Sequence, residues 1–209
     1  LLNIWGSDHS GYVKRLQSAV GELNKKADYI FDIKLTSLVN LINGKQVLKM
    51  SKRQGNYVTL REVVEKVGSD VLRYMMISRS IDKKIDFDFE IVKSKSKDNP
   101  VFYIQYAYAR CMSLISIYEK TFNTSLKNID LMQVNLSNLN LNEEIIMIIK
   151  VCNFFNVIIK AAKFYEPHRI ANYLLDVAKD FHAYWGLGKL DSSKKVIIDQ
   201  DYNISLSRI

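Results

Sequence analysis

The chain has 209 residues, of which 48% are apolar and only 2 are proline. This composition excludes a disordered chain and favours a folded, mostly helical protein of one or two domains. With 30 Lys and Arg against 22 Asp and Glu, the net charge is +8, which fits a polyanionic partner such as a nucleic acid; a basic protein without one is the alternative. Cys111 and Cys152 lie within apolar helical patterns and lack metal-ligand spacing, which indicates reduced, buried thiols in a cytoplasmic protein.

The chain opens on a short apolar run, Leu1 to Trp5, followed by a polar turn and a helical pattern from Tyr12 to about Asn24. A strand, a tight turn and a helix in this order are typical of parallel sheets that bind ligands at the carboxyl ends of their strands. Gly6 allows a ligand to approach the backbone, Asp8 can accept hydrogen bonds from ribose hydroxyls or an amine, and His9 can donate one. The same residue types also fill ordinary turns.

A hairpin and a basic turn come next. The residues Asn43-Gly44 are the strongest hairpin signal in the chain, and the returning segment leads into Lys49-Met50-Ser51-Lys52-Arg53. This turn carries four donors, three of them charged. Because charge-assisted hydrogen bonds are about twice as strong as neutral ones, it suits a polyphosphate and can neutralise charge as pyrophosphate leaves. A solvated basic turn with no ligand is the alternative.

Two short helices are predicted after the basic turn. Thr59 and Glu62 fit a capping box at the start of a helix from Leu60 to Lys66. A second helix runs from Ser69 to about Arg79, with its inward face formed by Val71, Leu72, Met75 and Met76. The stretch from Asp82 to Glu90 is predicted to be a charged connection.

A domain boundary is predicted at residues 98 to 100, because Asn99 is a good helix cap and Pro100 suits the first helical position. The helix that follows runs to about Lys120, with a core seam of Ile104, Tyr108, Cys111, Ile115 and Tyr118. A second stripe contains Tyr103, Tyr106 and Arg110. Tyrosine beside arginine can stack on bases and pair with phosphates, although packing is the commoner role of an aromatic stripe.

The most apolar stretch, Ile145 to Phe164, lies in a helix predicted from about Asn142 to Tyr165, after a loop over residues 121–141. One narrow polar stripe interrupts it, at Lys150, Asn153, Asn156, Lys160 and Lys163. A membrane span would not carry this stripe, so we predict a core helix with one edge in solvent. The stripe could also face nucleic acid, but a wetted face is the commoner explanation.

The last predicted helix begins at Glu166-Pro167 and ends near Trp185, with an inner face of Ile170, Tyr173, Leu174, Val177, Ala178 and Phe181. Its end presents aromatic rings beside a glycine, which can form a stacking platform for an unpaired base. The remainder, residues 191–209, is polar and then hydrophobic, without a terminal cap.

Four stretches together resemble class I aminoacyl-tRNA synthetases, and the arginyl enzyme in particular. The sequence from Lys49 to Leu60, Lys-Met-Ser-Lys-Arg-x-Gly-Asn-x-Val-Thr-Leu, is similar to the signature loop of the class. The other three are Trp5 to Val13, Gly68 to Tyr74 and Asp98 to Arg110, in the same order and spacing. Because the likeness continues through Arg169 to Leu174 and Phe181-His182, it covers nearly the whole chain.

The resemblance implies a two-part fold: an α/β remnant of a class I Rossmann-type catalytic domain over residues 1–98, followed by an all-α helical-bundle anticodon-binding domain over residues 99–209. It implies an arginine–tRNA ligase, in which arginine and ATP, with Mg²⁺, form arginyl-adenylate before the arginyl group passes to the arginine tRNA. No prosthetic group, resident metal or membrane is implied, and the protein is expected to be a cytoplasmic monomer.

The resemblance also assigns roles to individual residues. The catalytic residues on the loop that closes over ATP would be Lys49, Ser51 and Lys52. Further ATP contacts would come from Gly6, Asp8, His9, Met50 and Arg53. By position, Tyr184 and Trp185 fall where the family has aromatic contacts to the anticodon loop, and the second candidates for tRNA binding are Tyr106 and Arg110.

The sequence departs from the family in one signature. The His-x-Gly-His turn is absent, since the three histidines are His9, His168 and His182. The family's amino-terminal domain and the last helix of its anticodon domain are also missing, so we expect a carboxy-terminal portion that is inactive alone. The alternatives are a standalone tRNA- or RNA-binding helical module without catalysis, a cysteinyl- or methionyl-type synthetase, and a nucleotidyltransferase of similar nucleotide fold.

Overall fold

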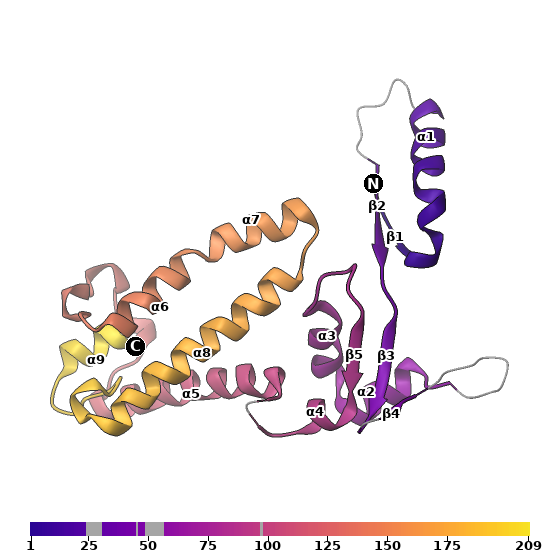
Figure 1. The fold of residues 1–209 in the computed structure, drawn as a ribbon. Helices are drawn as coiled ribbons and strands as arrows, with labels where there is room; N and C mark the ends of the chain where they lie inside the picture. Colours follow the sequence, from indigo (N-terminus) through magenta and orange to yellow (C-terminus); the bar gives the residue numbers. More distant parts are fainter. Residues whose placement is uncertain (24–30, 45, 49–56, 97) are drawn as a thin grey trace. The chain divides into compact units, whose positions relative to one another are not determined.

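The computed structural model describes residues 1–23, 31–44, 46–48, 57–96 and 98–209. The chain divides into two compact units, each with its own elements (Figure 1). The first unit contains Leu1–Ser94 and Phe164–His168. The second contains Lys95–Lys163 and Arg169–Ile209.

The amino-terminal elements form a two-stranded parallel sheet beside a helix. Strand β1 (Leu2–Gly6) pairs in parallel with β2 (Asp32–Thr36), so that Trp5 lies opposite Leu35. Between them come the 3-10 helix η1 (Ser7–Tyr12) and helix α1 (Val13–Leu23). The predicted order of strand, polar turn and helix is therefore confirmed.

A second, three-stranded sheet has the order β4-β3-β5. Strand β3 (Val39–Asn43) turns at Gly44, whose φ of +63° suits glycine, and pairs antiparallel with β4 (Gln46–Val47). The predicted hairpin is confirmed. The charged connection predicted over residues 82–90 is wrong, because it contains β5 (Ile85–Asp88), parallel to β3, and the start of α4 (Phe89–Lys93).

Helices α2 (Leu60–Val67) and α3 (Ser69–Ile77) pack against this second sheet. The predicted capping box is present: the Thr59 amide donates to Glu62 Oε2 at 2.9 Å, and the Glu62 amide donates to Thr59 Oγ1 at 3.2 Å. The core of the first unit contains Leu41, Val63, Leu72, Phe87, Phe89 and Val92. Of the predicted Rossmann-type fold, the described residues thus show two small sheets, each with one parallel pair.

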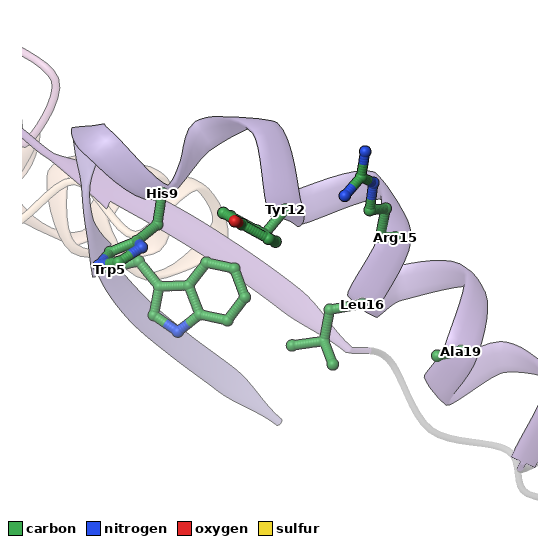
Figure 2. A pocket seen from close by; sticks show the side chains of 6 residues that line it. All are labelled: Trp5, His9, Tyr12, Arg15, Leu16 and Ala19. Atoms are coloured by element: carbon green, nitrogen blue, oxygen red, sulfur yellow. The ribbon is translucent and has the colours of Figure 1, made fainter.

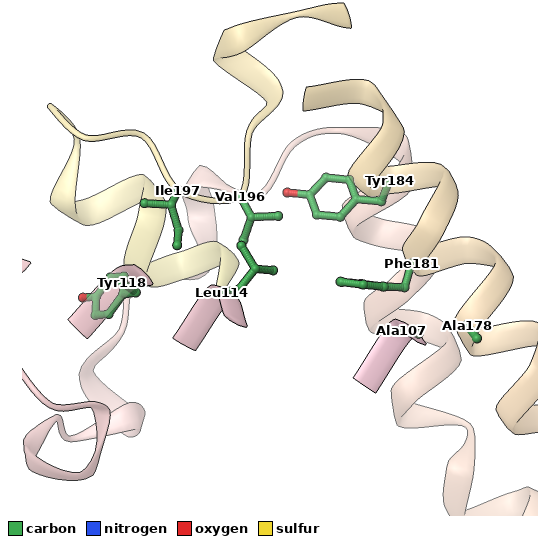
Figure 3. Packing of buried hydrophobic residues seen from close by; sticks show 8 residues of the cluster. All are labelled: Ala107, Leu114, Tyr118, Ala178, Phe181, Tyr184, Val196 and Ile197. Carbon is green, nitrogen blue, oxygen red and sulfur yellow. The ribbon is translucent and has the colours of Figure 1, made fainter. Parts of the chain in front are cut away.

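The second unit is built on the long helices α5 (Pro100–Phe122) and α8 (His168–Leu190). Its core cluster contains Ala107, Leu114, Tyr118, Ala178, Phe181, Tyr184, Val196 and Ile197 (Figure 3). The predicted seam of α5 is wrong at Tyr108, which is 67% exposed. The predicted inner face of α8 is likewise wrong at Leu174, which is 43% exposed. Ala178 and Phe181 are buried as predicted, and Ala171 is buried with them.

Asn99 begins α5 as predicted. Its side-chain Oδ1 accepts hydrogen bonds from the amides of Val101 at 3.1 Å and Phe102 at 3.3 Å, and Asn99 is itself buried. Pro100 occupies the first turn, where its missing amide hydrogen costs nothing.

Replacing Asn99 with alanine is therefore expected to lower the free energy of unfolding by about 1–2 kcal/mol, because two amides at a buried helix end lose their acceptor. Urea unfolding followed by circular dichroism measures this loss. Asn99→Asp should retain most of the stability, because aspartate is an equally good cap. Equal stability of the alanine variant and the wild type would contradict the role of this cap.

The apolar helix of residues 142–164 is interrupted at Asn153, which separates α6 (Asn142–Cys152) from α7 (Phe154–Phe164). By length and composition the whole stretch could cross a membrane, a test that core helices also pass. Only 6% of its most apolar window is buried, so the prediction of a core helix is wrong; Ile149 and Phe155, for example, are 64% and 77% exposed. In the polar stripe, Lys150 forms an ion pair with Asp180. Cys152 at the end of α6 is exposed, so its predicted burial is wrong.

Short elements complete the second unit. The predicted loop over residues 121–141 contains three 3-10 turns, η3 (Leu126–Asn128), η4 (Leu131–Gln133) and η5 (Leu136–Asn138). The final segment contains η6 (Ser192–Lys194) and α9 (Tyr202–Arg208), a helix not predicted from the sequence. Asp201 caps α9 by accepting from the Ile204 amide at 2.9 Å.

Candidate functional site

The first unit contains an aromatic pocket of about 730 Å³ at the carboxyl end of β1 (Figure 2). Trp5 comes from the strand, whereas the other lining residues, His9, Tyr12, Arg15, Leu16 and Ala19, come from η1 and α1. The Trp5 and His9 rings lie edge to face with their centroids 6.4 Å apart, and the Arg15 guanidinium lies 5.7 Å from the centroid of the Tyr12 ring.

The three predicted turn residues lie at this pocket or next to it. His9 lines it directly and lies 3.8 Å from the Asp8 carboxylate, measured from Nε2 to Oδ2. Gly6 ends β1, and a Cβ atom there would lie 2.6 Å from Asp8 Oδ1. Any side chain at Gly6 would therefore force the Asp8 carboxylate to turn away. The structure thus places His9 in the pocket with Asp8 beside it, and Gly6 leaves room for the observed position of the Asp8 carboxylate.

The chemistry of the aromatic pocket suits a flat ligand that carries negative charge. Aromatic side chains provide apolar surface for a ring system, and the Arg15 guanidinium can bind a phosphate or carboxylate through two parallel hydrogen bonds. The sequence prediction missed Trp5, Tyr12 and Arg15. The detectable signal was their position, since they flank the Gly-Ser-Asp-His turn on both sides.

The predicted catalytic residues lie outside the described part of the chain. They are Lys49, Ser51 and Lys52, and the same holds for the predicted ATP contacts Met50 and Arg53. Within the described residues, no group of three or more His, Cys, Asp or Glu side chains could hold a metal ion.

In the second unit, Arg110 joins two helices in an arrangement that we call the arginine cluster: Tyr103, Tyr106, Arg110, His182 and Trp185. Its guanidinium donates to Tyr106 OH at 2.9 Å and contacts His182 Nδ1 at 2.8 Å. The guanidinium carbon lies 4.1 Å from the Tyr106 ring centroid and 5.1 Å from that of Trp185. Tyr106 and Arg110 of α5 therefore meet Trp185 of α8, although 75 residues separate Arg110 from Trp185 in the sequence.

His182 holds the arginine in place. A guanidinium can only donate, so Nδ1 of His182 accepts its hydrogen bond; Nε2 lies 3.1 Å from the Tyr103 carbonyl oxygen, which can only accept. Both contacts are satisfied together when the neutral imidazole carries its hydrogen on Nε2. The sequence prediction placed His182 in a family motif but gave it no role. This position between Arg110 and α5 makes it a positioning residue.

The arginine cluster offers a cation, two aromatic rings and hydroxyl groups at a partly exposed surface. Tyr106 is 44% exposed, and its ring stacks on Phe102 with an interplanar angle of 12°. Among the described residues, the hydrogen bonds to Tyr106 and His182 use two of the five N–H donors of the guanidinium. Such a surface can stack on an unpaired base and bind phosphate or a base edge.

Tyr184 lies in the core rather than at this surface. It is 6% exposed and belongs to the core cluster of Figure 3. Its hydroxyl donates to Glu144 Oε1 at 3.0 Å. The same oxygen accepts from Arg208 Nε at 2.7 Å, and the side chains of Glu144 and Arg208 are each 3% exposed. Burial raises the pKa of the Tyr184 hydroxyl well above its ordinary value. Adjacent residues on a helix point about 100° apart, so Trp185 can line the surface while Tyr184 packs inside.

Two family models match the chain. The DALR anticodon binding domain matches residues 104–209, which is half of the chain, and the class I tRNA synthetases (K) model matches residues 29–123. The second match contains the basic turn, and the first contains most of the arginine cluster.

Curated relatives and solved structures agree with these matches. An arginine–tRNA ligase from Ehrlichia ruminantium (strain Gardel) is 44% identical over 98% of the chain, and one from Rickettsia peacockii (strain Rustic) is 38% identical over the whole chain. An arginyl-tRNA synthetase structure from Campylobacter jejuni covers 99% of the chain, with a TM-score of 0.77 and 29% identity, and this chain covers 43% of it.

The chain spans about a third of the curated relatives, 34% and 36% of their lengths. It belongs to the family defined by the DALR anticodon binding domain, and corresponds to the carboxy-terminal portion of arginyl-tRNA synthetases.

Proposed function

We propose that this chain functions as part of an arginine–tRNA ligase. This enzyme uses ATP, with Mg²⁺, to activate arginine and attach it to the arginine tRNA. The observation that carries this proposal is the 44% identity to an arginine–tRNA ligase over 98% of the chain. The whole reaction belongs to the longer proteins, of which the chain spans about a third. We further propose that the protein is a cytoplasmic monomer with no prosthetic group.

We assign the aromatic pocket to the adenosine of ATP. Trp5 and Tyr12 offer ring surfaces for adenine, and the adjacent Asp8 carboxylate can accept from ribose hydroxyls. The phosphates would be held by the signature loop, through Lys49 and Lys52, with Ser51 as a further donor. These two assignments place no nucleophile in the site. The chemistry therefore depends on positioning the substrates and on stabilising the charge of the leaving pyrophosphate.

We assign the arginine cluster to the anticodon loop. Arg110 presents a planar set of donors, held by Tyr106 and His182, and Trp185 provides a ring next to it. Loop nucleotides are unstacked, so their bases can stack on aromatic side chains and their edges can be read by arginine. Tyr184 is left out of this interface because it is buried and bonded to Glu144.

Two measurements on the chain test the proposed function. Binding of an arginine tRNA transcript, followed by fluorescence anisotropy, is expected without ATP, and a non-cognate transcript should bind more weakly. ATP–pyrophosphate exchange with arginine and tRNA is expected to be absent, because the chain lacks the His-x-Gly-His residues. Equal binding of all transcripts would favour a general RNA-binding module, and measurable exchange would defeat the prediction that the chain is inactive alone.

A further inference from the structure

One side of helices α6 and α7 exposes a large apolar surface, which we call the outer apolar face. Residues three and four apart on a helix are neighbours, so its side chains form a continuous surface along each helix. Its exposed members are Ile145, Ile146, Ile148, Ile149 and Val151 of α6 and Phe155, Ile158 and Ile159 of α7. Soluble proteins rarely expose contiguous apolar patches larger than a few hundred Å², and such patches mark interaction sites for proteins or membranes.

The opposite side of the same two helices is fixed to α8. The Phe154 ring stacks on Tyr173 with the centroids 5.2 Å apart, and the Tyr173 hydroxyl donates to the Lys150 carbonyl oxygen at 3.1 Å. Lys150 also forms the ion pair with Asp180, and Ala161 is buried. These contacts keep the outer apolar face turned away from α8. They also prevent α6 and α7 from leaving the unit to span a bilayer.

The charges beside the outer apolar face are positive only. Residues 145–164 contain no aspartate or glutamate. Lys160 and Lys163 are exposed, and they come one and four residues after Ile159. A lysine can lay its aliphatic stem along apolar surface while its ammonium group reaches a polar boundary. The surface therefore suits a partner with an apolar interior and an anionic boundary.

We propose that the outer apolar face binds the surface of a membrane that contains anionic lipids, with α6 and α7 lying in the plane of the interface. Phe155 and Ile159 enter the acyl boundary, and Lys160 and Lys163 contact the lipid phosphates. Basic amphipathic helices bind membrane surfaces by this combination of apolar burial and attraction to anionic lipids. The inference goes beyond the proposed function and does not rest on it.

The width of the outer apolar face favours a membrane over a single partner helix. Five of the seven residues from Ile145 to Val151 are both apolar and exposed. A helix that packs as in a coiled coil covers about two positions in seven, so one partner helix, including α6 of a second copy, would leave much of the face in water. A lipid surface has no such limit.

The test uses the full chain with vesicles of equal parts phosphatidylglycerol and phosphatidylcholine, and vesicles of phosphatidylcholine alone as the reference. Co-sedimentation measures the bound protein. The outer-face pair, Phe155→Ser with Ile159→Ser, is compared with Leu131→Ser and Met132→Ser, which remove apolar side chains from exposed positions of the same unit. Neither pair alters the net charge of +8, which by itself attracts the chain to anionic lipids. Circular dichroism confirms that each variant is folded.

The outer-face pair is expected to weaken binding to the anionic vesicles about 100-fold, because burying each apolar side chain contributes a factor of about ten. The Leu131 and Met132 variant should bind as the unmodified chain does. Binding to phosphatidylcholine alone should be much weaker, since each lysine near an anionic surface contributes a factor of about five.

A second measurement separates insertion from adsorption by charge. An environment-sensitive dye is attached to Cys152, which is exposed at the end of α6, in a chain with Cys111→Ala. Its emission is expected to shift to the blue when anionic vesicles are added, because the dye enters the acyl boundary. An unshifted emission, or equal weakening by the outer-face pair and its control, would show adsorption by net charge and overturn the inference.

Two further outcomes bear on the occupant and on the proposed function. Absence of vesicle binding, together with a dimer that the outer-face pair dissociates in analytical ultracentrifugation, would overturn the inference and assign the face to a second copy. Binding of the arginine tRNA transcript is measured separately, and the outer-face pair should leave it unchanged. A failure of vesicle binding therefore leaves the proposed function intact, and a failure of tRNA binding leaves this inference intact.

Discussion

Replacing Arg110 with alanine is expected to weaken binding of the anticodon stem-loop about 10- to 100-fold. The guanidinium is already oriented by Tyr106 and His182, so a base edge or phosphate can use it without further ordering. A bidentate arginine contact to a base contributes about 1–3 kcal/mol, and each 1.4 kcal/mol changes affinity tenfold. Anisotropy titration with labelled RNA measures the change.

Two further variants separate this contact from net charge. Arg61→Ala removes an exposed arginine of α2 in the other unit and should leave affinity nearly unchanged. Arg110→Lys keeps the charge but loses the planar donors, so it should recover only part of the binding. If Arg61→Ala and Arg110→Ala weaken binding equally, the effect is general electrostatics and the assignment of the arginine cluster is wrong.

Replacing Glu144 with alanine is expected to lower the free energy of unfolding by about 3–5 kcal/mol. Glu144 and Arg208 form an ion pair whose side chains are both 3% exposed, and Tyr184 donates to the same carboxylate oxygen. Removing the acid leaves a buried guanidinium without its counter-charge, which is the costly case for a buried pair. Urea unfolding of the chain with Trp5 replaced by phenylalanine, followed by Trp185 fluorescence, reports the loss in this unit.

A double variant tests the cause of that loss. Glu144→Leu combined with Arg208→Met removes both charges and should be clearly more stable than Glu144→Ala, because no uncompensated charge is buried. Arg208 also donates to the Lys195 carbonyl oxygen, so the final segment should be less firmly held in the double variant even though it is folded. A double variant as unstable as Glu144→Ala would show that packing, rather than charge, accounts for the loss.

Local signals of the sequence gave reliable predictions where a few neighbouring residues decide the structure. Thr59 with Glu62, Asn99 with Pro100, and Asn43 with Gly44 each satisfy or redirect the backbone within four residues, and all three predictions are confirmed. Strand β5 was missed because its acidic residues dominate the segment. Ile85 and Phe87 nevertheless alternate with Asp86 and Asp88, which is the period of a half-buried strand.

Burial was harder to predict because it depends on partners far away in the sequence. Apolar residues lie on all sides of α6 and α7, so their periodicity does not indicate which of them are buried. Similarly, Tyr184 and Trp185 are indistinguishable as adjacent aromatic residues at a helix end. Tyr184 is buried because it packs in the core cluster and because Glu144, 40 residues earlier, accepts its hydroxyl hydrogen bond.

The geometry of the candidate sites was also hard to predict, because it depends on residues far apart in the sequence. The sequence placed Tyr106 and Arg110 on one helix and Trp185 on another, but their meeting depends on the packing of α5 against α8. The charged donors of the Lys49 to Arg53 turn indicated a polyphosphate, and the resemblance to a family then assigned catalytic roles to Lys49, Ser51 and Lys52. The resemblance did not give His182 a role, since the contacts of its ring with Arg110 and the Tyr103 carbonyl oxygen depend on the packing of α8 against α5.

The small sheet of β1 and β2 has a consequence for how the chain loses its structure. Within the described residues the sheet holds only these two strands, and α1 beside it contains no buried residue. Two-stranded sheets are at best marginally stable by themselves, whereas the second unit has a contiguous core around Tyr118 and Phe181. Amide hydrogens of β1 and β2 should therefore exchange with solvent through a local opening that leaves the helical unit intact.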